Sequence, residues 1–151
     1  NVVAAKAVAF KEALEPSFEK YAHQIVRNAK ALAEELMSQG IKLVTNGTDN
    51  HLILIDLTDK GVGLGKQIAV ALEESGICTN ANTIPYDPST PFKPSGVRIG
   101  TPIPTTMGMK ESEMKHIGQL IAKVINNPED SNLKSKVCEE IKELCHNFSF
   151  Y

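Results

Sequence analysis

Arg98 is the residue whose type and setting most clearly suggest chemistry. It lies in the short β-prone run Ser95-Gly96-Val97-Arg98-Ile99-Gly100 and is one of only two arginines in the chain. A guanidinium is a planar fork of donors that holds a carboxylate or phosphate through two parallel hydrogen bonds. The sequence therefore predicts an anion-binding group at Arg98. The alternative is that Arg98 pairs with a carboxylate of its own chain, such as Asp87.

The histidines do not form a recognisable metal site. None of the four shares a helix face with another at metal-ligand spacing, and these residues are His23, His51, His116 and His146. His51 follows Asp49-Asn50 at a turn, where polar side chains often satisfy the loop backbone, so a scaffold role is favoured over a catalytic one. No nucleophile–base–acid set stands out. We expect no metal and no complete catalytic constellation.

Three cysteines and a glycine-rich segment also have structural interpretations. Cys78, Cys138 and Cys145 have no C-x-x-C spacing, which favours free or buried thiols in a reducing compartment such as the cytoplasm. The segment from Gly61 to Lys66 lacks the four-residue spacing and the following Ser or Thr of a phosphate loop. It predicts a flexible loop that leads into a helix.

Composition excludes several classes of protein. The 151 residues carry a net charge of −2 with both signs interspersed, so no basic surface for nucleic acid is indicated. No apolar run reaches about 18 residues, so no membrane span is expected. The first helical pattern begins apolar at Val2 with no recognised cap or preceding strand, which suggests a fragment of a longer protein.

Rigid surroundings position Arg98. The stretch Ile77–Met109 holds six of the chain's eight prolines. A proline fixes its own φ and disfavours helix in the residue before it, so a stiff, non-helical loop is predicted around Pro85, Pro88, Pro91 and Pro94. Thr101-Pro102 then resembles an N-cap followed by proline at the first helical position. Arg98 is thus expected in a short strand between this loop and a helix.

The remaining pattern is helical with few strands. Helices are predicted up to Leu14, from Pro16 to Gly40, around Ile68–Leu72, around Met114–Val124 and around Leu133–Leu144. Ile41 and Leu43 alternate with a lysine as a half-exposed strand, and Leu52–Ile55 is apolar on both faces, as in a central strand. The two strands are expected to form an antiparallel hairpin. The fold class is α+β, with a small antiparallel sheet and helices packed on one side.

Two long motifs stand out, N-G-T-D-N-H-L-I-L-I-D-L and T-N-A-N-T-I-P-Y-D-P-S-T-P-F-K-P-S-G-V-R-I-G-T-P. Both resemble motifs of serine hydroxymethyltransferase, a fold-type I enzyme that uses pyridoxal phosphate. The resemblance runs from the first helix to about Asn126. It implies an interdomain helix remnant over 1–15 and a C-terminal small domain over 16–151. The large cofactor-binding domain has no counterpart, because no histidine is followed directly by a lysine as in the family's T-H-K-type motif.

The resemblance also implies roles for individual residues. Arg98 occupies the position that grips the substrate carboxylate, and Asn82 the position that hydrogen-bonds the folate pterin. Thr90-Pro91-Phe92 matches the triplet that lines the folate site. Met107 stands where many relatives have arginine, so a secondary contact there is in doubt.

The implied reaction interconverts serine and glycine and transfers the one-carbon unit to tetrahydrofolate, in a homodimer with pyridoxal 5'-phosphate as cofactor. This fragment alone is expected to be inactive. One alternative is another fold-type I enzyme, an aminotransferase or aldolase, although such an enzyme has no need of the N-x-N-x-x-P-x-D segment. The other is a free-standing, non-catalytic partner domain.

Overall fold

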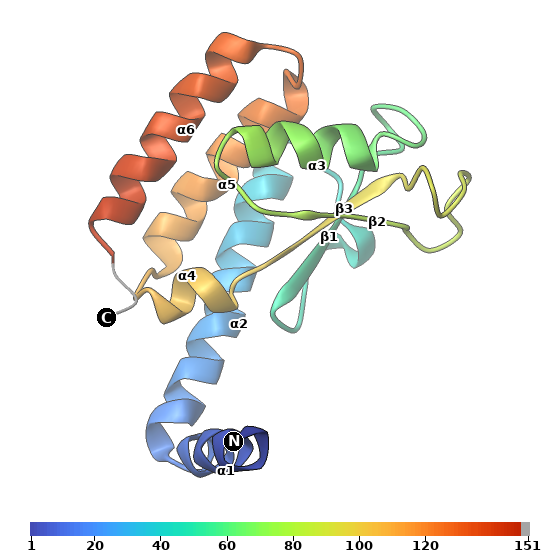
Figure 1. Cartoon of the computed structure of the whole chain (residues 1–151). Helices are drawn as coiled ribbons and strands as arrows, with labels where there is room; N and C mark the ends of the chain where they lie inside the picture. Colours follow the sequence, from blue (N-terminus) through green and yellow to red (C-terminus); the bar gives the residue numbers. More distant parts are fainter. Residues whose placement is uncertain (149–151) are drawn as a thin grey trace.

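The computed structural model describes residues 1–148 and shows a three-stranded antiparallel sheet with helices on one face (Figure 1). The elements in chain order are α1 (Val2–Ala13), α2 (Pro16–Ser38), the 3-10 turn η1 (Val44–Asn46), β1 (Leu52–Asp56), α3 (Gly65–Glu74), β2 (Asn80–Asn82), β3 (Gly96–Gly100), α4 (Pro102–Thr106), α5 (Glu111–Asn126) and α6 (Ser131–His146). The predicted α+β class is confirmed. No helix in this range is long and apolar enough to cross a bilayer.

The strand that carries Arg98 lies in the middle of the sheet. The strand order is β1-β3-β2, and both outer strands run antiparallel to β3. The prediction that Leu52–Ile55 is the central strand, covered on both faces, is therefore wrong. Only one face of β1 is covered, because Ile53 and Ile55 are buried while Leu52 is exposed and Leu54 is partly exposed.

In place of the predicted strand at residues 41–43, the structure has a single β-bridge. Leu43 forms one isolated antiparallel bridge with Ile55, although Ile41 and Leu43 are both buried. Immediately afterwards the chain turns into η1, where Thr45 and Asn46 adopt positive φ of 63° and 53°. A left-handed backbone cannot continue a strand, so the hairpin ends there. The third strand is instead β2, which the sequence analysis did not predict.

The core lies between the sheet and helices α2, α3 and α5. Ile53, Ile55, Val97 and Ile99 point into it from the sheet. Met114 on α5 is fully buried. Helices α2 and α5 approach closely at Gly118, where a Cβ would lie 2.9 Å from Glu35 Cγ. Burying one large aliphatic side chain contributes about 1.5–3 kcal/mol, so this cluster dominates the stability of the fold.

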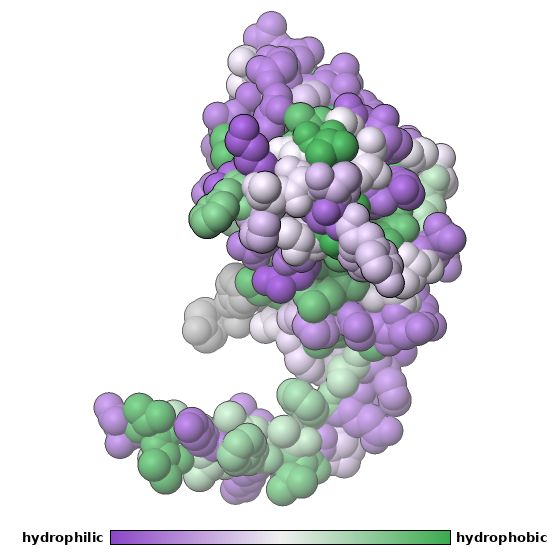
Figure 2. Space-filling view, turned by 90° about the vertical axis from the view of Figure 1, so that its right-hand side faces the viewer, coloured by the Kyte–Doolittle hydropathy of each residue, from purple (hydrophilic) through white to green (hydrophobic). Residues whose placement is uncertain are grey.

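Helix α1 extends away from this body and has no buried residue (Figures 1 and 2). Asn1 caps it, since its Oδ1 accepts the Val2 N–H at 2.7 Å, a cap that the sequence analysis did not recognise. Large apolar side chains exposed on it include Val3 and Phe10. Because a 12-residue helix has little stability without packing, α1 is the least supported element. The proposed domain division at residue 15 stays a prediction.

Candidate functional site

Arg98 stands on the open face of the sheet, opposite the helices. Its neighbours in β3, Val97 and Ile99, point into the core, whereas Arg98 is exposed and lies across from Leu54 of β1 and Asn80 of β2. Among residues 1–148 its guanidinium takes part in no ion pair and no side-chain hydrogen bond. The chain's other arginine, Arg27, donates from Nε to Glu111 Oε1 at 3.1 Å.

Asp87, the carboxylate considered as a partner for Arg98, binds the loop instead. Its Oδ2 accepts the backbone N–H groups of Ser95 at 2.9 Å and Ile84 at 3.3 Å. Its Oδ1 accepts the Ser89 N–H at 2.9 Å and the Ser95 hydroxyl at 2.7 Å. These bonds, led by the one from the Ser95 backbone, lower the pKa of Asp87 to about 2. Asp87 and Arg98 therefore form no ion pair, and Asp87 instead connects the two ends of the proline loop.

Ser95 connects this loop to the glycine-rich segment. Ser95 is fully buried, and its Oγ accepts the Gly63 N–H at 2.9 Å. The Gly65 N–H donates to Pro94 O at 2.8 Å, and a Cβ on Gly65 would lie only 2.4 Å from Gly96 O. The glycines thus let two backbone segments touch just before Arg98. Residues 61–64 form the predicted loop, and the helix that follows it already includes Gly65 and Lys66.

The structure brings Asn82 and Arg98 to the same pocket. This pocket of about 350 Å³ lies between the 44–50 loop and the open sheet face. Asn82 Nδ2 donates one hydrogen bond to Thr83 O at 2.7 Å, which leaves its Oδ1 and second amide hydrogen for a ligand. Thr90-Pro91-Phe92 does not line this pocket. It lies on the proline loop, where Phe92 is 81% exposed.

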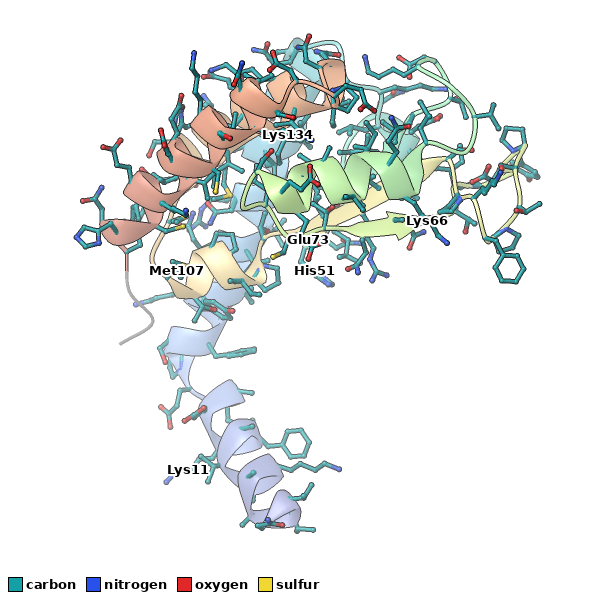
Figure 3. The ribbon with its side chains drawn as sticks, turned by 45° about the horizontal axis from the view of Figure 1, so that its top comes forward. Lys11, His51, Lys66, Glu73, Met107 and Lys134 are labelled. Carbon is teal, nitrogen blue, oxygen red and sulfur yellow. The ribbon has the colours of Figure 1, made fainter. Side chains whose placement is uncertain are left out.

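A second, larger cavity of about 530 Å³ lies at the end of the sheet, and both His51 and Met107 line it (Figure 3). Its walls include apolar side chains from α4, α5 and α6, together with the 76–80 segment and Arg98 of β3. The turn before β1 is held by Asn50, whose Oδ1 accepts the Leu52 N–H at 2.8 Å, and by Thr48, whose hydroxyl donates to Leu52 O at 2.6 Å. Among the described residues the His51 imidazole forms no hydrogen bond that holds this turn. Only the His51 carbonyl takes part, by accepting the Thr101 N–H.

A buried asparagine positions α4, which follows β3. Asn28 of α2 is fully buried; its Nδ2 donates to Thr105 Oγ1 at 2.8 Å and to Met109 O at 2.9 Å. The predicted N-cap residue Thr101 does not cap α4 with its side chain. Its hydroxyl donates to Ile25 O at 2.9 Å instead. Both bonds tie the segment after Arg98 to α2, and neither was predicted from the sequence.

The site offers a free guanidinium suited to an anion, and the described residues hold no cluster of metal ligands beside it. No group of three or more His, Cys, Asp or Glu residues within 1–148 could hold a metal ion, and the three cysteines are free. The arrangement is a guanidinium on a rigid strand with a carboxamide close by, and it suits a ligand with both a carboxylate and a hydrogen-bonding edge.

A comparison with known protein families identifies the family of the chain. The family model described as serine hydroxymethyltransferase matches residues 1–121, most of the chain and all of the elements from α1 to α4. The matched region contains Arg98, Asn82 and the proline loop. The chain therefore belongs to the serine hydroxymethyltransferase family.

Proposed function

We propose that this chain forms the substrate- and folate-contacting part of an enzyme that interconverts serine and glycine and passes the one-carbon unit to tetrahydrofolate. One observation carries the proposal: within residues 1–148 the Arg98 guanidinium has no ionic partner, although it is held rigidly on the middle strand. An arginine in that state is prepared to accept a carboxylate from outside the chain. The carboxylate of the amino-acid substrate fits this role.

Arg98 would act by position. Two parallel hydrogen bonds from its guanidinium hold the substrate carboxylate in one plane and so fix which bond at Cα faces the cofactor. Because Asp87 and Ser95 tie down the loop before β3, this orientation is set before the substrate binds. Arg98 holds and orients the substrate carboxylate, and it transfers no proton.

Family membership implies pyridoxal phosphate, which when bound serves as an electron sink for the bonds at the substrate Cα. No histidine of this chain is followed directly by a lysine, so the lysine that carries the cofactor in the family's T-H-K-type motif is not found here. We infer that another part of the enzyme, a large domain that precedes residues 1–15, holds the cofactor. We therefore expect the 151-residue chain alone to be inactive, and the working enzyme to be a homodimer.

Asn82 would hold the pterin of tetrahydrofolate. A carboxamide offers both an acceptor and a donor, as a pterin edge requires, and Asn82 lines the pocket that also contains Arg98. The two substrates would then lie on one open face of the sheet. Thr90-Pro91-Phe92 would contact the folate from the proline loop, outside that pocket.

The test is substitution of each arginine in the full enzyme. Arg98→Lys keeps the charge but loses the two-pronged grip, and we expect KM for serine to rise roughly ten- to 150-fold, as for the loss of a hydrogen bond between charged groups. Arg27→Lys is the matched control, because Arg27 already pairs with Glu111; its KM should not change. A KM unaffected by Arg98→Lys would contradict the proposal.

A further inference from the structure

Tyr86 occupies a backbone position that tyrosine rarely adopts. The Asp87 N–H donates to Ile84 O at 3.1 Å, so residues 84–87 form a tight turn with Pro85 second and Tyr86 third. Tyr86 has φ of +54°. A positive φ in the third position of such a turn is normally taken by glycine or asparagine. For a bulky side chain it is a genuine outlier.

Nothing within the described chain requires a tyrosine there. The Tyr86 side chain is fully exposed, so its ring gains no packing that would offset the strained backbone. Pro85 and the Asp87 carboxylate, which accepts the Ile84 and Ser89 N–H groups, define the turn without it. A strained residue held by its surroundings and presented to solvent is typical of a binding contact.

We propose that the Tyr86 ring packs against the p-aminobenzoyl ring of tetrahydrofolate; this inference rests on the proposed folate site. Tyr86 follows Asn82 by four residues, so their Cα atoms lie at most about 14 Å apart. In folate, likewise, the pterin is joined through a methylene group to a second ring, the aminobenzoyl ring, a short distance away. Asn82 would hold the pterin, and the rigid turn would present the second aromatic surface. Offset aromatic rings attract one another more strongly than the burial of their area alone explains.

The experiment measures binding of two ligands to the full enzyme in the presence of glycine. One is tetrahydrofolate, and the other is 6-methyltetrahydropterin, which has the pterin but no aminobenzoyl group. Tyr86→Asn should raise Kd for tetrahydrofolate roughly three- to tenfold and leave Kd for the truncated pterin unchanged. Tyr86→Phe, which retains the ring, should behave as wild type. Asn82→Ala should weaken both ligands, since the pterin is common to them.

Each outcome separates this inference from the proposed function. Tyr86→Asn should keep or raise the melting temperature, because asparagine tolerates a positive φ; a marked fall would mean that the ring supports the fold and would overturn the inference. Equal effects on both ligands, or none on either, would also overturn it. If Asn82→Ala weakened neither ligand, the folate site itself would be wrong, and Tyr86 with it.

Discussion

Gly65→Ala is the sharpest test of how the site is held in place. A Cβ on Gly65 would lie 2.4 Å from Gly96 O and 2.6 Å from Pro94 O. Both are backbone oxygens of the segment that leads to Arg98, so neither can rotate away as the end of a side chain would. The backbone of Gly65 is not in the left-handed region. The substitution therefore tests close packing alone.

The expected cost follows from two contributions. Forcing a methyl group into a packed contact costs about 1–3 kcal/mol. Separating the two segments also weakens the hydrogen bond from the Gly65 N–H to Pro94 O, now 2.8 Å long, at about 0.5–1.5 kcal/mol. Together they lower the free energy of unfolding by about 2–4 kcal/mol. For a chain of this size that is a fall in melting temperature of roughly 5–15 °C.

Thermal and denaturant unfolding, followed by circular dichroism, measure this effect. Lys66→Ala is the matched control, because Lys66 is the next residue of α3 and exposed; it should change stability by no more than about 0.5 kcal/mol. Helix propensity alone predicts the opposite sign for Gly65→Ala, since alanine is favoured over glycine by about 1 kcal/mol. A variant as stable as wild type, or more stable, would refute the packing argument.

Three further predictions concern buried or paired polar groups. The pKa of Asp87 is lowered to about 2 in the folded chain, so its stabilising effect is present above its ordinary pKa and is lost as the pH falls from about 4 to 2; Asp87→Asn should remove this part of the pH dependence of unfolding. Asn28→Ala strands the Thr105 hydroxyl and the carbonyl that now accept from Asn28 and should cost about 1–3 kcal/mol in chemical denaturation; a neutral result would contradict that role. Burial raises the pKa of Asp56, but hydrogen bonds from Lys42 and Thr58 outweigh this effect, so the pKa is lowered overall. Lys42→Met should therefore raise this pKa, which the carboxyl ¹³C shift reports; an unchanged titration would show that the ion pair, 2.7 Å long, has no effect.

Local patterns predicted much of this fold. The proline spacing indicated a loop without helix between β2 and β3, and the structure has none there. The 3.6-residue periodicities predicted the long helices. Gly61 and Gly63 were correctly interpreted as part of a loop, whereas Gly65 already begins α3. Each of these rests on short-range geometry, which the identity of a few neighbouring residues decides.

The errors involve residues whose partners are distant in sequence. Asn80-Ala81-Asn82 has little strand propensity of its own, yet it pairs with β3 across a long loop, because context outweighs intrinsic preference in sheets. Asn28 is a polar residue of a kind usually found on a helix surface. It is instead buried, and its side chain donates hydrogen bonds to Thr105 and Met109. No local pattern shows which polar side chain will be buried against which backbone group.

The sequence by itself determined the family, through motifs that span most of the chain, and it predicted an anion-binding role for Arg98, an arginine set between glycines in a proline-stiffened segment. Only the tertiary structure decided that Arg98 is available to a ligand. Asp87 could have neutralised it, and instead accepts four hydrogen bonds from the loop. The physical reason is that a carboxylate is stabilised by several donors placed around it, and only the folded loop brings those donors together.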